Sequence, residues 1–208
     1  MKYKDFFKYM VVLGSCCSVR PALATTIDFE TLPDSSDVGN FYGASAGVDF
    51  QSAISLTAGI SLNEIDYPPH SGSVVVSDNV ANNGDPMVLT FHDPAGSLSA
   101  YFAYSSQLTF SAFDSSGTLL GSFTTATGSH LGSDEQITVP YSGISKLNIA
   151  GGVAGSFIMD DLNFAFDAAS QSGKGVPETG STLLLSLLSA ACLILFGRNL
   201  RTHSCSPL

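Results

Sequence analysis

The sequence predicts an all-β protein, an antiparallel β-sandwich of the jelly-roll kind, flanked by two terminal segments of different character. Short stretches with apolar residues at every second position alternate with clusters of turn-forming residues. Glycine is frequent, with 20 residues, whereas charged residues make up only 12%, which disfavours long surface helices. Before residue 168 no stretch carries the apolar stripe of an amphipathic helix. We therefore divide the chain into predicted segments: 1–24, 25–167, 168–175, 176–201 and 202–208.

The alternation is clearest in residues 107–113, where Leu108 begins a run with an apolar residue at every second position. The Asp-Ser-Ser-Gly sequence at 114–117 then predicts a hairpin turn in which Gly117 supplies a positive φ. About ten strands at this kind of spacing favour a sandwich. The predicted strands are 26–30, 47–56, 73–77, 87–92, 97–104, 107–113, 118–125, 136–140, 144–150 and 156–166.

Charge is unevenly distributed along the chain. Of the 18 acidic residues only Asp5 and Glu178 lie outside residues 25–167, a segment in which Lys146 is the only lysine or arginine. Such an acidic domain repels nucleic acid and anionic lipid, so neither is an expected partner. One interpretation is that it attracts divalent cations, basic partners or a cationic matrix, and the alternative is that the acidic surface only keeps an exported protein soluble. The four cysteines are outside the same segment, which excludes a disulfide framework or a thiolate metal site there.

Carboxylates gather at the two ends of this domain, where Asp28 and Glu30 precede the first turn and Asp160 and Asp161 lie in the last strand. If the first and last strands pair, these side chains converge. Ca²⁺ binds six to eight oxygens, carboxylates among them. The four residues are therefore the candidate ligands of a structural Ca²⁺, and the alternative is that they serve turns and solvent.

Other chemical motifs are weak. Residues 43–47 match Gly-x-Ser-x-Gly, but that motif needs a strand, a turn and a helix in an α/β sheet, and no such pattern surrounds it. His70, His92 and His130 lack metal-ligand spacing. Tyrosines are candidates to stack on a sugar ring, since the chain has no tryptophan: Tyr42, Tyr67, Tyr101, Tyr104 and Tyr141. No residue set compels catalysis, and we expect a protein that is not an enzyme.

The N-terminus has the pattern of a secretory signal peptide. Lys2, Lys4 and Lys8 precede a short apolar stretch, and Ala22-Leu23-Ala24 predicts cleavage after residue 24. The sequence before Cys16 also fits a lipoprotein cleavage box, which is the alternative. Either way the chain is expected to be exported.

The C-terminus carries an apolar run at 183–196 that is followed by Arg198 and Arg201. With its flanking small residues the run reaches the lower limit of about 17 residues for a membrane-spanning helix. The arginines would act as a basic stop on the cytoplasmic side. A single C-terminal transmembrane helix is therefore predicted.

Directly before this helix stand the residues Val176, Pro177, Glu178, Thr179 and Gly180. Together, the motif, the helix and the arginines resemble a PEP-CTERM-type sorting signal, closest to the VPDSG-CTERM variant, with Glu178 for Asp and Thr179 for Ser. The resemblance implies processing by an exosortase in a bacterium that makes extracellular polysaccharide. The domain's opening Asp28-Phe29-Glu30 and closing Asp160-Asp161-Leu162 also resemble those of domains found ahead of such tails. Similar sandwiches occur in carbohydrate-binding modules.

The same five residues resemble the LPXTG signal of sortase substrates, which implies cleavage after Thr179 and attachment to the cell wall. The leading expectation is an exported protein of the envelope or extracellular matrix, transiently anchored in the membrane, with a structural or adhesive role in exopolysaccharide. The alternatives are a Ca²⁺-dependent carbohydrate-binding module and a sortase-anchored surface protein.

Overall fold

The computed structural model describes residues 24–78, 85–126 and 128–167. The predicted signal peptide, linker, sorting motif, transmembrane helix and basic stop lie outside these residues. Within the described ranges, no helix is long and apolar enough to cross a membrane.

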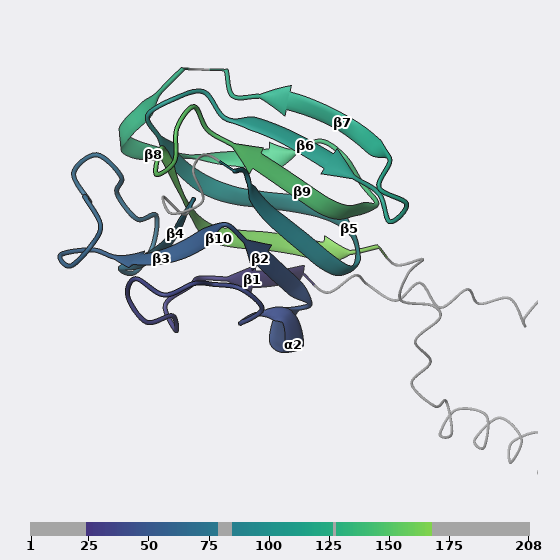
Figure 1. Cartoon of the computed structure of the whole chain (residues 1–208), viewed down its shortest axis with the longest axis horizontal. Helices are drawn as coiled ribbons and strands as arrows, with labels where there is room; N and C mark the ends of the chain where they lie inside the picture. Colours follow the sequence, from purple (N-terminus) through teal and green to yellow (C-terminus); the bar gives the residue numbers. More distant parts are fainter. Residues whose placement is uncertain (1–23, 79–84, 127, 168–208) are drawn as a thin grey trace, which may run out of the picture. The chain divides into compact units, whose positions relative to one another are not determined.

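Ten strands and one helical turn make up the described domain (Figure 1). In chain order they are β1 (Ala24–Ile27), α2 (Gly43–Ala46), β2 (Val48–Gln51), β3 (Ala53–Thr57), β4 (Val74–Asp78), β5 (Met87–Tyr104), β6 (Thr109–Phe113), β7 (Leu119–Thr124), β8 (His130–Val139), β9 (Ile144–Ala150) and β10 (Phe157–Phe166). Every pairing between these strands is antiparallel, so the prediction of an all-β antiparallel domain is confirmed.

The strands form two layers that share one strand. In the first sheet β10 pairs on one side with the second half of β5, and on the other with β1 and β4. β3 extends this sheet from β4, and β8 extends it from β5. In the second sheet the first half of β5 lies between β2 and β9, and β6 and β7 follow.

The change of sheet occurs near Pro94, where the register between β5 and β9 shifts between Thr90 and Ala95. Proline has no N–H to donate to a ladder, so it suits the point where a strand leaves one partner for others. The sequence predicted two strands, 87–92 and 97–104, on either side of this point. They are two halves of one bent strand.

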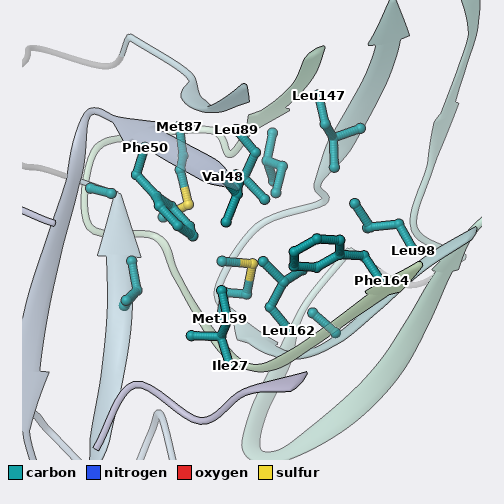
Figure 2. Close-up of a cluster of buried hydrophobic side chains, with 14 of the residues drawn as sticks. Ile27, Val48, Phe50, Met87, Leu89, Leu98, Leu147, Met159, Leu162 and Phe164 are labelled. Carbon is teal, nitrogen blue, oxygen red and sulfur yellow. The ribbon is translucent and has the colours of Figure 1, made fainter. Parts of the chain in front are cut away.

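The core lies between the two sheets and is a single cluster of buried side chains (Figure 2). Phe102 of the first sheet meets Phe110 of the second with ring centroids 5.4 Å apart, and Phe164 meets Phe91 at 5.2 Å. Each such buried side chain contributes roughly 1.5–3 kcal/mol. The predicted inward residues of 107–113 are in this core, with Leu108, Phe110 and Ala112 at most 1% exposed.

Two local predictions need correction. The predicted strand 47–56 is interrupted at Ser52, whose φ of 56° breaks the ladder between β2 and β3. The short helix α2 was not expected, because one turn is too short to show a period in the sequence. The hairpin turn at 114–117 is confirmed: Gly117 has φ 80°, and its N–H donates to the Asp114 carbonyl at 3.0 Å.

Candidate functional site

The outer face of the first sheet is partly covered by the segment that joins β3 to β4. Leu62 and Tyr67 of this segment belong to a second apolar cluster with Val75, Ala103 and Ile158 of the sheet beneath. On the far side the Gly132 N–H donates to the Asp66 carbonyl at 2.8 Å, which fastens the segment to β8. Residues 58–73 therefore form a layer on this face, and we name them the covering segment.

Asp160 holds the end of the covering segment from below. Its side chain is fully buried, and Oδ2 accepts the backbone N–H groups of His70 at 2.9 Å and Ser71 at 3.0 Å. Oδ1 accepts the N–H of Asp161 at 2.8 Å. Burial raises the pKa of Asp160 from 3.8 to about 6, although these amide bonds oppose the change.

Glu30 holds the next residues of the segment in the same way. Its Oε1 accepts the N–H groups of Ser73 and Val74, each at 2.8 Å. Gly72 lies between the two anchors with φ 52°, and a Cβ there would be 2.2 Å from Glu30 Oε1. Any other residue here would be strained by the positive φ and would displace the Glu30 carboxylate. We call Glu30 and Asp160, with the backbone amides they bind, the carboxylate clamp.

The first and last strands do pair, which was the condition for these carboxylates to converge, since Ile27 of β1 is opposite Leu162 of β10. This brings Glu30, Asp160 and Asp161 to one segment, where the Ser71 hydroxyl donates to Asp161 Oδ1 at 3.1 Å. Asp28 stays beside Glu30 and accepts its N–H at 3.3 Å. In the described ranges no three His, Cys, Asp or Glu side chains are grouped so that they could hold a metal. As arranged, these carboxylates accept hydrogen bonds from backbone amides and from Ser71, and the Ca²⁺ site stays a prediction.

Most of the tyrosines proposed for sugar stacking are already packed against other side chains. Tyr42 and Tyr104 are buried in the core. Tyr101 is covered by the His70 ring, stacked on it with centroids 3.3 Å apart, and His70 Nδ1 is 2.5 Å from Asp134 Oδ2. These three rings are therefore structural, whereas Tyr67 and Tyr141 are half-buried and pack against the apolar clusters.

The Gly-x-Ser-x-Gly motif is the helical turn α2, directly before β2. Gly43 packs against Asp49, where a Cβ would be 2.4 Å from Oδ1, and Gly47 takes φ 74°. His92 Nε2 is 3.0 Å from Asp49 Oδ2 beside this turn. No hydrogen bond joins the exposed Ser45 to His92 among the residues that the structure describes. The glycines thus serve packing, and the turn does not form a strand–turn–helix nucleophile site.

The outer face of the second sheet is different, because no other described segment forms a layer on it and its outward residues are exposed or half-buried. The registers align these residues in rows across the strands. We call this surface the polar face. One row is Gln51, Val88, Asn148, Ser111 and Ser122, and the next is Asp49, Thr90, Lys146, Phe113 and Leu119.

Polar contacts within these rows are few. The Ser111 and Ser122 hydroxyls are 3.1 Å apart, and Asn148 Oδ1 is shielded from solvent without a described hydrogen-bond partner. Lys146 Nζ lies 4.6 Å from the centroid of the Phe113 ring, a cation–π contact. A depression of about 390 Å³ opens at this end of the face, between the 114–117 turn and the segment from Thr90 to Pro94. This is within the size range of ligand sites.

No protein-family model matches the chain, and neither does any curated protein. Among solved structures, the K1 cleaved adhesin domain of Lys-gingipain from Porphyromonas gingivalis W83 is 14% identical, with 70% of this chain and 99% of that chain covered at a TM-score of 0.43. A family 29 carbohydrate-binding module is 14% identical over 69% of this chain and 89% of its own, at 0.39. Another, from Piromyces equi, is 8% identical over 59% and 83%, at 0.36.

Proposed function

We propose that this chain is an exported, non-enzymatic protein of the bacterial envelope or extracellular matrix that binds polysaccharide and acts there as a structural or adhesive component. The observation that carries the proposal is the polar face. It is an open surface across five strands on which hydroxyl and amide side chains stand beside Val88, Phe113 and Leu119, in a domain where Asp160 and Glu30 bind the protein's own backbone.

Sugar hydroxyls both donate and accept hydrogen bonds. Ser, Thr, Asn and Gln side chains do the same, so a row of them suits a hydroxyl-rich chain without fixing a single orientation. The acidic domain disfavours nucleic acid, as its charge predicts. An uncharged glycan meets no such repulsion.

Delivery would depend on the termini. In this proposal the signal peptide 1–24 directs export, and the Val176–Gly180 motif presents an extended peptide to an exosortase. The apolar run 183–196 and Arg198 would hold the motif at the membrane surface until it is processed. Sortase processing after Thr179 is the alternative route, to the cell wall instead of the matrix.

The delivery part is tested by the intact mass of the mature protein purified from its own host. Loss of the helix with an end near the motif would support exosortase processing, whereas an end at Thr179 carrying a cell-wall fragment would support sortase. Recovery of the uncut chain through Leu208 in the membrane fraction would contradict both sorting routes and leave a plain anchor.

The binding part is tested by affinity electrophoresis of the purified chain through gels that contain polysaccharide from the same host, with Ca²⁺ and with EDTA. Retardation in both conditions supports the proposal, and retardation lost with EDTA supports the Ca²⁺-dependent module. Unchanged mobility in every gel would contradict polysaccharide binding. Release of new reducing ends during incubation would contradict the non-enzymatic role.

A further inference from the structure

We propose that the depression at the end of the polar face is the principal sugar subsite of this protein, and that it takes an uncharged, hydroxyl-rich glycan rather than a polyanionic one. This inference rests on the proposed function and adds the place and the ligand class. The subsite is built by Thr90, His92, Asp114, Ser115 and Lys146.

The subsite joins three separate pieces of chain at one point. β5 supplies Thr90 and His92, β9 supplies Lys146, and the turn after β6 supplies Asp114. The pairing of Thr90 with Lys146 and of Lys146 with Phe113 fixes this arrangement. It therefore stands on paired strands and a hydrogen-bonded turn, which suits a preformed site.

Asp114 is held as an ionised acceptor. Its Oδ1 accepts the N–H groups of Ser116 and Thr118, both at 2.9 Å, and the Ser116 hydroxyl at 2.7 Å. The Ser116 hydroxyl bond is the main cause that lowers the pKa of Asp114. All three bonds fall on Oδ1, so Oδ2 remains as an acceptor among the described contacts, and a sugar hydroxyl can donate to it.

Lys146 complements Asp114, because an ammonium group only donates hydrogen bonds. Lys146 lines the depression, and its Nζ lies 4.6 Å from the centroid of the neighbouring Phe113 ring. Thr90 donates and accepts, and Asp49 lies beside it in the next strand. The depression therefore combines a group that only accepts hydrogen bonds (Asp114), one that only donates them (Lys146) and one that does both (Thr90). Vicinal hydroxyls of a sugar can pair with all three.

The charged side chains around the depression disfavour a polyanionic ligand. Lys146 is the only lysine or arginine of residues 25–167, and the carboxylates of Asp49 and Asp114 share its surroundings. An acidic polysaccharide would be attracted by one cation, Lys146, and repelled by several carboxylates. A neutral polysaccharide forms the same hydrogen bonds without this repulsion. The adjacent row from Gln51 to Ser122 continues the polar surface beyond the depression.

The test compares three variants of the full chain, purified in a detergent without a sugar headgroup. Lys146→Met keeps the aliphatic stem, and Thr90→Val removes one hydroxyl at constant shape. Thr138→Val is the matched control, an exposed threonine of β8 on the outer face of the first sheet. Gels containing dextran, hydroxyethylcellulose or galactomannan present neutral chains, and alginate presents a polyuronate.

We expect the chain to bind at least one neutral polymer. Affinity should fall about tenfold in Lys146→Met and roughly threefold or more in Thr90→Val, as expected for losing a charged and a neutral hydrogen bond. The control should bind as the unchanged chain does, and a thermal melt of each variant identifies one that has failed to fold. Thr90→Val keeps the test decisive if Lys146→Met is unstable.

Neutral-polymer binding that both variants retain would overturn the subsite and leave the proposed function standing. Binding to alginate alone, weakened by salt and by Lys146→Met, would overturn the ligand class. Absence of binding to every polymer, including that of the host, would overturn the proposed function itself.

Discussion

Replacing Asp160 by asparagine should change how the stability of the domain depends on pH. The folded pKa of about 6 lies above the ordinary 3.8, so the folded protein holds this proton more tightly than the unfolded chain does. The group therefore stabilises the fold fully below about pH 4, and this contribution is lost as the pH rises through about 6. Asparagine does not titrate and removes the dependence.

The size of the effect follows from the same two values. They differ by roughly a hundredfold in proton affinity, and each tenfold is worth about 1.4 kcal/mol, which makes about 3 kcal/mol in full. Because the unfolded group is already partly ionised at pH 4, the contribution changes by roughly 2.5 kcal/mol between pH 4 and pH 7. The amide will also turn one N–H₂ toward a backbone donor, at the His70 and Ser71 side or at Asp161. That mismatch costs roughly 1–3 kcal/mol at every pH.

The assay is urea unfolding of the unchanged chain and of Asp160→Asn at pH 4, 5, 6 and 7. The difference in unfolding free energy between the two proteins should narrow by roughly 2.5 kcal/mol as the pH rises from 4 to 7. Asp85→Asn, at an exposed position, is the control for removing a carboxylate. Parallel pH profiles for the unchanged chain and Asp160→Asn would refute the account of this carboxylate.

Three further outcomes are expected. Gly72→Ala should lower the unfolding free energy by about 2 kcal/mol or more in urea, because it adds a strained positive φ and a Cβ against Glu30; an unchanged midpoint would contradict the clamp geometry. Asp114→Ala should lower the urea midpoint of unfolding through the lost turn bonds, whereas Asp85→Ala, measured the same way, should leave it unchanged. If the predicted Ca²⁺ site exists, Ca²⁺ should raise the melting temperature and EDTA should reverse the rise, whereas equal melting temperatures would count against it.

The strands were predictable because each buries one face, and alternation in the sequence records this directly. Residues 107–113 and 144–150 show it: the second coincides with β9, and the first contains β6. The exchange of β5 between sheets was not predictable, because both of its halves alternate normally on either side of Pro94. Only the registers show which neighbours each half has.

The candidate site, like the fold, was predictable from the sequence only in part. Asp160 and Glu30 stood out as acids near the chain ends of the domain, and the pairing of β1 with β10 brings them to one segment. Their partners are backbone amides, which nearly every residue has, so no residue pattern could indicate the clamp. The row from Gln51 to Ser122 collects residues from five strands, and no spacing along the chain records such a row.

The pairing of β1 with β10 also constrains the order of events when the chain is made. Synthesis proceeds from the N-terminus, and Ile27 has no partner until Leu162 has followed it. The clamp likewise waits, since Asp160 fastens residues that were made long before it. Until the last strand emerges, β1 lacks its ladder partner and the covering segment lacks its Asp160 anchor. The domain can therefore complete its fold only after its last strand has been made.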